Sequence, residues 1–425
     1  MIKKYIKETA KYLLRCYPII RPYIKRIDAM YEMSGEELKK RNEERFLHIF
    51  RCAYDKSPFY YRLYTEAGIK KEDIRCLEDI KKLPVITKEM VKKHAAEMLT
   101  VPKWQVMAGH TSGTTGTPLT VFSSWPSIWW NQAYTYSARL RNSFRYGQPL
   151  VSLRGNLDRK TMYMKVHASN TLYLSSYCIN KDTVKAYYDM IIQHQPVAIE
   201  GYPSSLYTLA LCMKEVGLKL HIPVAFTSSE TLLDYQRHLI EMQLGTEIYD
   251  NYGMTEQTIY LQEAFNHQGY YELPGYSINE YLEDGEICTS LTNEAFPLIR
   301  YRSNDVIELA EMDADHPQII VKSVVGRVDD FLICKDGSRV TRVDFVEDGK
   351  HIKACQWIQK EMGKLLVLIV PDEGFADQDK DFVLGETIKR VGENNMDIEV
   401  KLAELADLRL SKRGKFRLIV NEIPK

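Results

Sequence analysis

The sequence lacks the marks of several protein classes. Its eight cysteines include no CxxC pair, so no ligand spacing supports a structural zinc site. Scattered cysteines in a chain of 425 residues favour reduced thiols in a cytoplasmic protein over a disulfide scaffold. Basic residues are not in excess, because 57 Lys and Arg balance 57 Asp and Glu, which argues against nucleic acid as a partner.

Long apolar runs are also missing. The uncharged stretch 117–138 is interrupted by Pro118 and Pro126 and is rich in polar side chains, so no transmembrane segment is expected. The first 26 residues contain eight Lys or Arg and one Glu, without the uninterrupted apolar core of a signal peptide. Their apolar residues at helical spacing predict a basic amphipathic helix, which either packs on the rest of the chain or makes a peripheral contact with a membrane or partner.

The length exceeds that of a single hydrophobic core, so at least two domains are expected. The first 95 residues are mainly helical in pattern, with Ser34 as the cap of a helix over 35–54. From 150 to 255, apolar strands (150–153, 197–199, 224–226 and 247–249) alternate with helices, one capped by Asp182, one ending at Gly217 and one closed by Gly245. This alternation predicts an α/β fold with a parallel sheet covered by helices.

The last third of the chain has a different pattern. Short strands and turn residues between 270 and 325 predict a small, more antiparallel subdomain, with a strand over 286–289. Beyond Gly326, strands at 365–370 and 398–402 accompany a helix near 382–391. These elements predict a separate α+β domain of about 100 residues.

The strongest local signal is the segment Thr111-Ser112-Gly113-Thr114-Thr115-Gly116-Thr117-Pro118. Glycine lets backbone N–H groups approach an anion, and hydroxyl groups add further donors, as a phosphate-binding loop requires. It is not a Walker loop, because no Gly-Lys-Ser/Thr follows. From composition alone, a flexible polar turn explains the segment equally well.

Four further segments follow in a fixed order. Residues 250–256 (Asp-Asn-Tyr-Gly-Met-Thr-Glu) come after a predicted strand, and Tyr301-Arg302-Ser303-Asn304-Asp305 begins 45 residues beyond Glu256. Gly326-Arg327-Val328-Asp329-Asp330 comes next, and Gly414-Lys415 lies near the C-terminus. Each segment alone is an ordinary turn or surface strand, whereas their order and spacing together are not expected by chance.

This set resembles the adenylate-forming superfamily of acyl-CoA synthetases, nonribosomal-peptide adenylation domains and luciferases. Within it, Ser57-Pro58-Phe59-Tyr60-Tyr61 and the segment 83–88 are similar to the phenylacetate–CoA ligase group and its CapK-like relatives of capsular polysaccharide biosynthesis. The resemblance runs from about residue 45 to the C-terminus. It implies an N-terminal basic helical segment (1–44), a large domain that binds ATP and the acid (45–326), and a mobile C-terminal lid (327–425).

The resemblance also implies residue roles. Thr111, Ser112, Gly113, Thr114, Thr115 and Gly116 would hold the β- and γ-phosphates of ATP. Tyr252 would stack on adenine, Asp250 would accept from its amino group, and Asp305 would bind the ribose. Thr255 would bind the α-phosphate and Glu256 would ligate Mg²⁺. Arg327 would lie near the ribose and phosphate, and Ser229 and Glu230 would line the nucleotide pocket. The acid pocket would be bordered by Gly201, Tyr202 and Pro203. Asp329 would be the hinge, and Lys415 would be the catalytic lysine.

The implied reaction is ATP- and Mg²⁺-dependent formation of an acyl-adenylate, followed by transfer to coenzyme A. An alternative keeps the adenylation but sends the acyl group to an amine, a sugar or a carrier protein in polysaccharide assembly. A nucleotide-binding module without turnover is a third reading. Two departures from the superfamily pattern bear on the roles: Leu119 stands where many members have lysine, and the lid motif lacks an upstream proline, which leaves Lys412 as a second candidate for the catalytic lysine. By analogy, a homodimer is also expected.

Overall fold

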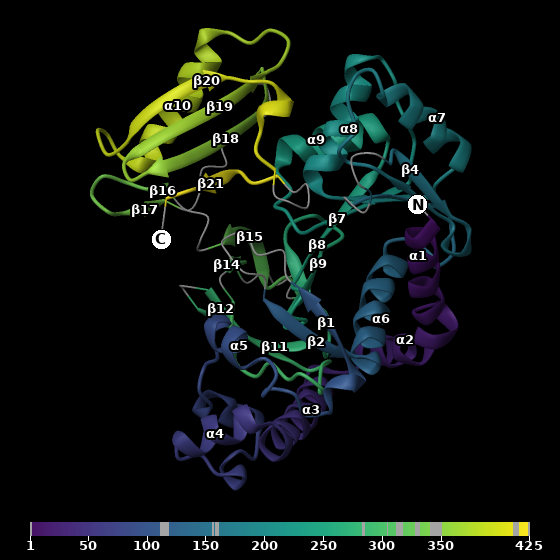
Figure 1. Ribbon diagram of the computed structural model, residues 1–425, viewed down its shortest axis with the longest axis vertical. Coiled ribbons are helices and arrows are strands. Elements are labelled where there is room, and N and C mark those ends of the chain that lie inside the picture. Colours follow the sequence, from purple (N-terminus) through teal and green to yellow (C-terminus); the bar gives the residue numbers. More distant parts are fainter. Residues whose placement is uncertain are drawn as a thin grey trace. The chain divides into compact units, whose positions relative to one another are not determined.

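The computed structural model describes residues 2–110, 119–154, 157, 161–282, 285–303, 305–311, 318–327, 332–340, 351–410 and 416–423 (Figure 1). The chain forms two compact units. The first comprises Met1–Leu150, Lys165–Thr171 and Tyr249–Val324, and the second comprises Val151–Met164, Leu172–Ile248 and Val325–Lys425. Each unit therefore combines segments that are far apart in the sequence.

Helices dominate the start of the first unit, as the sequence predicts. They are α1 (Ile2–Leu14), α2 (Tyr17–Tyr31), α3 (Gly35–Lys56), α4 (Pro58–Glu66), α5 (Lys88–His94) and α6 (Trp125–Arg141), with 3₁₀ turns η1 (Lys71–Asp73), η2 (Leu77–Lys82) and η3 (Lys103–Gln105). The predicted cap is confirmed: the Ser34 hydroxyl accepts from the backbone N–H of Glu37, whose carboxylate accepts from the backbone N–H of Ser34. This reciprocal pair satisfies two of the N–H groups left free at a helix start.

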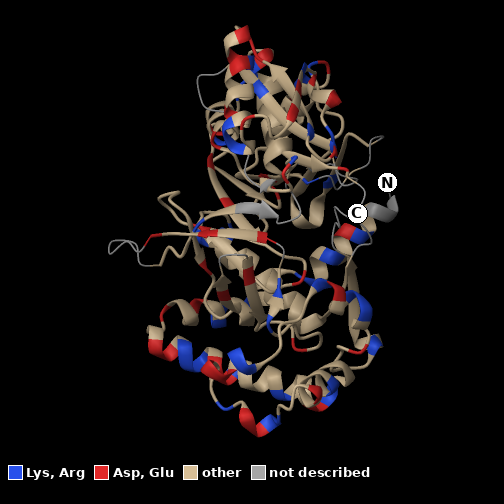
Figure 2. Ribbon diagram, turned by 90° about the vertical axis from the view of Figure 1, so that its left-hand side faces the viewer, with Lys and Arg blue, Asp and Glu red and all other residues tan. Residues whose placement is uncertain are grey.

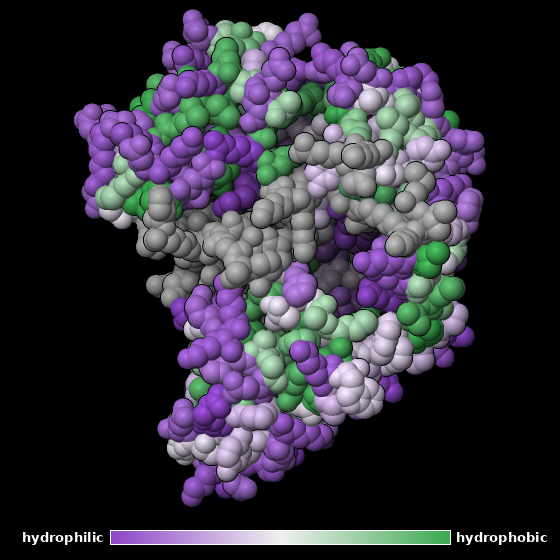
Figure 3. All heavy atoms as spheres, viewed as in Figure 1, coloured by the Kyte–Doolittle hydropathy of each residue, from purple (hydrophilic) through white to green (hydrophobic). Residues whose placement is uncertain are grey.

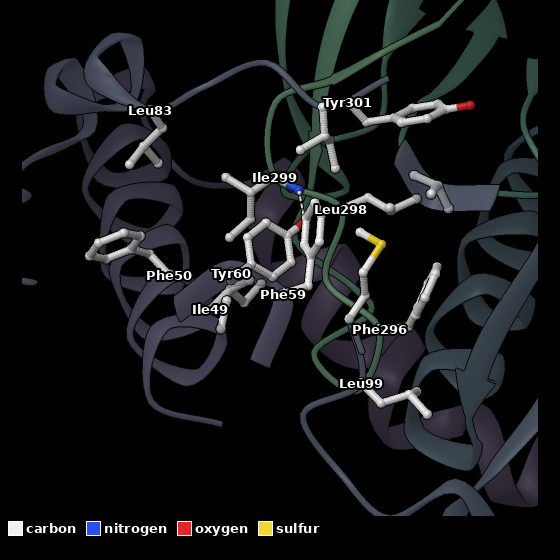
Figure 4. Close-up of a cluster of buried hydrophobic side chains, with 14 of the residues drawn as sticks. Ile49, Phe50, Phe59, Tyr60, Leu83, Leu99, Phe296, Leu298, Ile299 and Tyr301 are labelled. Carbon is white, nitrogen blue, oxygen red and sulfur yellow. Dashed lines mark hydrogen bonds between the residues drawn. The ribbon is translucent and has the colours of Figure 1, made fainter. Parts of the chain in front are cut away.

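A buried cluster joins these helices to the segment before Tyr301 (Figure 4). Tyr60 lies at its centre, where its hydroxyl donates to the carbonyl of Pro297 at 2.8 Å and accepts from the backbone N–H of Ile299 at 3.2 Å. Phe50 and Phe296 pack in the same cluster. Because Tyr60 satisfies two buried backbone groups of the chain leading to Tyr301, the helical layer fixes the place of that strand.

Antiparallel pairing is common among the strands of the first unit. In a ten-stranded sheet, β14 (Asp305–Leu309), β15 (Val321–Arg327), β10 (Tyr270–Glu272), β9 (Tyr260–Glu263) and β8 (Glu247–Gly253) are neighbours in that order. The pairs β15–β10, β10–β9 and β9–β8 are antiparallel, and both β8 and β15 contain a boundary between the units. A three-stranded sheet consists of β11 (Ser277–Leu282), β12 (Gly285–Ser290) and β13 (Tyr301–Arg302). The predicted antiparallel strand over 286–289 is therefore part of β12. A hairpin of β1 (Val106–His110) and β2 (Thr120–Ser124) is also antiparallel.

The second unit contains the predicted parallel strands. Here β7 (Val224–Ser228), β6 (Ala198–Gly201) and β3 (Leu150–Leu153) are neighbours in that order, and β6 and β7 pair in parallel. They are followed in the sheet by β5 (Thr171–Leu174) and β4 (Tyr163–Val166), while η4 (His167–Ser169), between β4 and β5 in the sequence, belongs to the first unit. The helices are α7 (Val184–His194), α8 (Pro203–Glu215) and α9 (Asp234–Leu244). This arrangement confirms the α/β fold class.

Two of the three predicted helix ends agree with the structure. Gly245 closes α9 with φ of +55°, and Gly217, with φ of +69°, follows the end of α8 at Val216. The prediction for Asp182 is wrong, because the side chain of Asn180 accepts from the backbone N–H groups of both Asp182 and Thr183, at 3.0 Å each. An Asx turn two residues earlier therefore satisfies the groups that the predicted cap would have bound.

The C-terminal part of the second unit contains the predicted α+β elements, within the same compact unit as residues 172–248. It contains a four-stranded sheet with the order β20 (Asp397–Leu402), β19 (Lys364–Pro371), β18 (Ile352–Glu361) and β21 (Ile419–Asn421). The other elements are α10 (Asp377–Val391), the strand pair β16 (Leu332–Ile333) and β17 (Arg339–Val340), and η5 (Leu405–Asp407). Trp357 is fully buried in the core of this part, and the Trp357 indole N–H donates to the Thr387 hydroxyl at 3.1 Å.

The domain limits inferred from the resemblance remain predictions. The limit between residues 44 and 45 falls inside α3, and that between 326 and 327 falls inside β15. Within the described ranges, no helix combines the length and the apolar character that a bilayer crossing needs.

Candidate active site

The predicted site residues fall into three groups. Thr111, Ser112, Gly113, Thr114, Thr115, Gly116, Asp329, Lys415 and the alternative Lys412 lie outside the described residues, as does the side chain of Arg327, whose backbone ends β15. Asp250, Tyr252, Thr255, Glu256 and Asp305 belong to the first unit. Gly201, Tyr202, Pro203, Ser229 and Glu230 belong to the second.

In the first unit, Tyr252 lies against two acidic residues. Its hydroxyl is 2.6 Å from Oδ2 of Asp305, at the start of β14, and 3.1 Å from Oε1 of Glu286, in β12. Since a phenol has one proton, the shorter bond to Asp305 is the one it donates to. The half-buried ring of Tyr252 and the carboxylate of Asp305, two residues with predicted nucleotide roles, are therefore coupled by a direct hydrogen bond.

Glu286 is fully buried beside this pair and was not predicted as a site residue. Burial raises the pKa of Glu286 to about 7, with a further upward effect of the nearby Asp305, while the hydrogen bond donated by Ser303 and the neighbouring Tyr252 hydroxyl oppose the rise. Its Oε1 accepts from the Ser303 hydroxyl at 2.5 Å, and its Oε2 has no hydrogen-bond partner among the described residues. A protonated Glu286 next to an ionised Asp305 suits this arrangement, because an ionised Glu286, buried beside the half-buried Asp305, would be repelled by its charge.

Asp250 lies two residues before Tyr252 on β8 and is buried. Its Oδ2 accepts from the Tyr270 hydroxyl at 2.8 Å, and its backbone N–H donates to Oε2 of Glu263 at 2.7 Å. Alternate residues of a strand point to the same face of the sheet. Asp250 and Tyr252 therefore share a face, although the adenine contact of Asp250 remains a prediction.

Thr255 and Glu256 form the middle of a turn. The backbone N–H of Gln257 donates to the carbonyl of Met254 at 3.0 Å, and Gln257 has a left-handed φ of +58°. The buried Gln257 side chain accepts from the Ser127 hydroxyl at 2.6 Å, which ties the turn to α6. This bond offsets the strain of a left-handed conformation at a residue other than glycine.

The same turn offers oxygen donors for a cation. Glu256 is buried and its Oε1 accepts from the Tyr301 hydroxyl at 3.4 Å, whereas Thr255 is exposed. A carboxylate and a hydroxyl on adjacent residues have the oxygen chemistry that Mg²⁺ prefers, so the donor set fits the predicted metal. Tyr301, at the end of the buried cluster around Tyr60, connects this donor set to the helical layer.

In the second unit, the predicted acid-pocket residues follow the carboxyl end of β6. Gly201 ends this strand, and a Cβ there would lie 2.8 Å from Cγ of Leu206 and 3.3 Å from the carbonyl oxygen of Leu153. Glycine is thus required by a close approach of backbone and side chain. Tyr202 precedes α8 and Pro203 begins it, at the position where proline is favoured.

Arg154, directly after β3, was missed by sequence reasoning. Its guanidinium donates to the Ser228 hydroxyl at the end of β7 at 3.0 Å and lies 3.6 Å from Oε2 of Glu200 in β6. Ligands of open α/β sheets bind at the carboxyl ends of parallel strands. That rule could have drawn attention to the first charged residue after the predicted strand 150–153, whereas nothing in the sequence identifies its partners.

Glu230 follows β7 after Ser229, which has a left-handed φ of +72°. Its Oε2 accepts from the backbone N–H of Ser204, in the first turn of α8, at 3.0 Å. Its Oε1 accepts from the backbone N–H of Phe416 at 2.8 Å. Phe416 also forms an isolated antiparallel β-bridge with Leu410. Because Phe416 directly follows Lys415 in the sequence, the carboxylate of Glu230 links α8 to the residue next to the predicted catalytic lysine.

Away from these groups, the described residues contain a further set of metal-type ligands, His48, Cys52 and Glu294. Nε2 of His48 lies 3.1 Å from Oε2 of Glu294, and the Arg45 guanidinium pairs with the same carboxylate at 3.0 Å. The arginine already supplies the positive charge that a cation would bring. This set is therefore explained as an ion-pair cluster.

Comparisons with known proteins agree with the expected resemblance. Residues 332–422 match the family model of the CapK C-terminal domain. The chain is 24% identical over 368 residues to the Protein CapK of Staphylococcus aureus, covering 79% of this chain and 81% of that one. It is 27% identical over 331 residues to a phenylacetate–coenzyme A ligase of Pseudomonas putida, covering 73% and 75%.

Among solved structures, the fold is similar to that of 2-hydroxyisobutyryl-CoA ligase in its postadenylation state, with a TM-score of 0.69 and 18% identity, covering 92% of this chain and 90% of that one. The chain is therefore similar, in fold and in sequence, to adenylate-forming ligases. More particularly, the chain is similar to the phenylacetate–CoA ligase and CapK group, as the sequence predicted.

Proposed function

We propose that this protein activates a carboxylic acid with ATP and Mg²⁺ to an acyl-adenylate and then transfers the acyl group to coenzyme A. The observation that carries the proposal is the hydrogen bond between Tyr252 and Asp305, which joins the residues assigned to adenine and ribose. The relatives named as phenylacetate–coenzyme A ligases support coenzyme A as the acceptor. The identity of the acid is not part of the proposal.

The proposed nucleotide contacts follow from the first unit. Asp305 would accept from the ribose hydroxyls, while the Tyr252 hydroxyl holds one of its oxygens in place. The partly exposed Tyr252 ring would stack on the base. The exposed hydroxyl of Thr255 would bind the α-phosphate, and the segment Thr111–Gly116 would hold the two outer phosphates.

Glu256 is proposed as the Mg²⁺ ligand. Its position in a turn held by Gln257 gives the carboxylate a defined orientation. The ion would offset negative charge on the phosphates. The nearby Tyr301 hydroxyl would stabilise the ionised carboxylate by donating a hydrogen bond.

In the first half-reaction, an oxygen of the substrate carboxylate attacks the α-phosphorus, and the bond to the bridging oxygen of pyrophosphate breaks. Lys415 would donate to the oxygens on which negative charge develops, a role that requires a cation placed before reaction. Glu230 would position this lysine through Phe416. In the second half-reaction, the thiolate sulfur attacks the acyl carbon and AMP leaves.

We further propose that residues 327–425 act as a lid that turns at Asp329 between the half-reactions. Arg327 would then contribute to the nucleotide site from the start of this segment. A lid that brings different residues to one pocket can serve two reactions in succession. The proposed compartment is the cytoplasm, since ATP and coenzyme A are available there and scattered cysteines fit a reducing compartment.

A second candidate function is adenylation with transfer to an amine, a sugar or a carrier protein. The match to Protein CapK over 368 residues favours it, as does the match of residues 332–422, within the segment proposed as the lid, to the CapK C-terminal domain. Both functions share the first half-reaction and all the residues assigned to it. They differ only in the nucleophile of the second.

The experiment is a pyrophosphate-release assay with ATP, Mg²⁺ and a panel of carboxylic acids, each with and without coenzyme A. Multiple turnovers that need both one acid and coenzyme A support the first function. A stoichiometric burst without turnover supports the second, and no release with any acid contradicts both. Lys415→Ala should lower pyrophosphate exchange by roughly 100-fold or more, whereas the same loss in Lys412→Ala, with Lys415→Ala unaffected, would assign the catalytic role to Lys412.

A further inference from the structure

Helix α1 presents three large apolar side chains to solvent. Ile6, Leu13 and Leu14 are 59%, 55% and 46% exposed. Positions 6 and 13 lie two turns apart, and position 14 is next to the second of them, so the three share one side of the helix. Figure 3 shows hydrophobic side chains over α1 at the right-hand edge of the molecule.

The opposite side of α1 packs on other parts of the first unit through Tyr12, whose ring stacks on that of Tyr146 with 5.1 Å between the centroids. The C-terminal end of α1 is anchored as well, because the Trp129 indole N–H donates to the carbonyl of Leu14 at 2.9 Å. These contacts fix which face of the helix is covered. The apolar residues are thus left outside by a defined docking of the helix and not by fraying.

Charge accompanies the exposed apolar residues. The first 26 residues contain eight Lys or Arg and one Glu, whereas the other 399 contain 49 and 56, so the positive charge is concentrated at this end. Lys7 on α1 and Arg21, Lys25 and Arg26 on α2 are exposed. Figure 2 shows basic residues recurring along the helices next to the N-terminus.

Helix α2 explains why its basic residues face outward. Its other side is buried through Ile20, Ile24, Ile27 and Met30, which pack with residues of α6. The two helices therefore combine covered faces with an exposed set of apolar and basic side chains. This combination is typical of helices that lie in the surface of a membrane.

We propose that α1 and the start of α2 dock the protein on an anionic lipid surface. The exposed apolar side chains enter the boundary between headgroups and acyl chains, and the lysines and arginines bind the lipid phosphates. A second copy of the chain is disfavoured as the occupant, because it would bring the same excess of positive charge to the same surface. With 13 residues, α1 is too short to span a bilayer and lies along it.

The test is flotation of the full-length protein with two kinds of vesicle, phosphatidylcholine alone and phosphatidylcholine with phosphatidylglycerol. The protein is expected to float only with the anionic vesicles, and to be released when the salt concentration is raised to about 0.5 M, which shortens the screening length. The double variant Leu13→Ser/Leu14→Ser should lower the partition coefficient roughly tenfold or more. Lys7→Ser/Lys25→Ser should lower it by about fivefold for each charge removed.

The matched control is Ile192→Ser/Leu402→Ser, which changes residues of similar exposure, 50% and 57%, elsewhere on the chain. This control should bind vesicles as the wild type does, and unchanged thermal midpoints would show that all variants are folded. Binding to neither vesicle, equal binding to both, or equal losses in the control would overturn the proposal. So would a dimer in sedimentation that Leu13→Ser/Leu14→Ser dissociates while vesicle binding is absent.

Discussion

The carboxylate of Glu230 accepts the backbone N–H of Phe416 at 2.8 Å, across 186 residues of sequence. Its other oxygen accepts from the backbone N–H of Ser204, so both acceptor atoms are used. A charged acceptor makes stronger hydrogen bonds than a neutral one. Glu230 thus holds the residue next to Lys415 against the start of α8.

The variant Glu230→Gln should slow adenylate formation selectively. An amide keeps one acceptor oxygen and replaces the other by a donor, so it cannot bind both N–H groups. We expect pyrophosphate exchange to fall roughly tenfold, the equivalent of about 1.4 kcal/mol. The rate of thioester formation from added acyl-adenylate should stay within about twofold, and both are measured by single-turnover kinetics.

The control for this prediction is Glu215→Gln. Glu215 forms an ion pair with Lys353, which also connects α8 to the C-terminal segment but involves no hydrogen bond to Phe416. It should leave both half-reactions unchanged. Equal losses in the two half-reactions for Glu230→Gln, or the same selective loss for the control, would show that Glu230 has only a structural role.

Removal of the Tyr252 hydroxyl should weaken nucleotide binding while the ring remains. Tyr252→Phe takes away the donor to Asp305, and Asp305→Asn changes the other partner of the same bond. Each change should raise the dissociation constant of AMP several-fold, by about 1 kcal/mol for Tyr252→Phe. The double variant should cost less than the two single changes together, since they remove one shared interaction.

Isothermal titration calorimetry with AMP measures these constants. Tyr281→Phe is the control, because the Tyr281 hydroxyl donates to Glu272 at 2.6 Å in the same unit and has no assigned nucleotide role. It should change the thermal midpoint and leave AMP affinity unaltered. Additive losses for Tyr252 and Asp305 would argue against their coupling.

The stability of the first unit should depend on pH through Glu286. Burial raises the pKa of Glu286 from 4.5 to about 7 in the folded protein, so the folded protein binds a proton that the unfolded chain loses first. The resulting stabilisation is complete below about pH 4.5 and is lost as the pH rises through about 7, a change of roughly 3 kcal/mol at most. Glu286→Gln is neutral throughout and should remove this part of the pH dependence.

Thermal midpoints measured from pH 5 to pH 8 test this prediction. The variant should lose less stability over that interval than the wild type. Glu66→Gln, which alters an exposed residue, should follow the wild-type profile. Parallel profiles for Glu286→Gln and the wild type would mean that Glu286 is ionised across the interval.

Gly201→Ala should destabilise the protein by about 1–3 kcal/mol, the range for overpacking a buried site. The added Cβ would meet Cγ of Leu206 at 2.8 Å, an atom near the base of its side chain that cannot easily move away. Gly385→Ala, inside α10, is the control, because beyond its chain neighbours and the helix backbone no atom of the described residues lies within 4 Å of the added Cβ. That change should stabilise by about 0.5–1 kcal/mol, and unfolding curves in urea would measure both; a neutral Gly201→Ala would contradict the proposed close approach.

Local chemistry was readable in the sequence wherever neighbours along the chain satisfy one another. Ser34 and Glu37 form their capping box within four residues, and Gly245 ends α9 through its own backbone conformation. The alternation of strands and helices from 150 to 255 likewise predicts the α/β fold from a pattern that neighbouring residues along the chain define. Asp182 shows the limit of such reasoning, because a competing local acceptor, Asn180, binds the same N–H groups.

The sequence by itself therefore determined the element types, the fold class and the order of the motifs, since these depend on short-range pattern. Only the tertiary structure decided which side chains meet. Glu286 lies beside Tyr252 and Asp305, Arg154 donates to Ser228, and Glu230 accepts from Phe416. The residues of these contacts are 19 to 186 positions apart in the sequence. The raised pKa of Glu286 depends on its burial, and the hydrogen bond from Phe416 to Glu230 depends on their distance in space. Burial and distance follow from the packing of many residues, so no single sequence position reveals them.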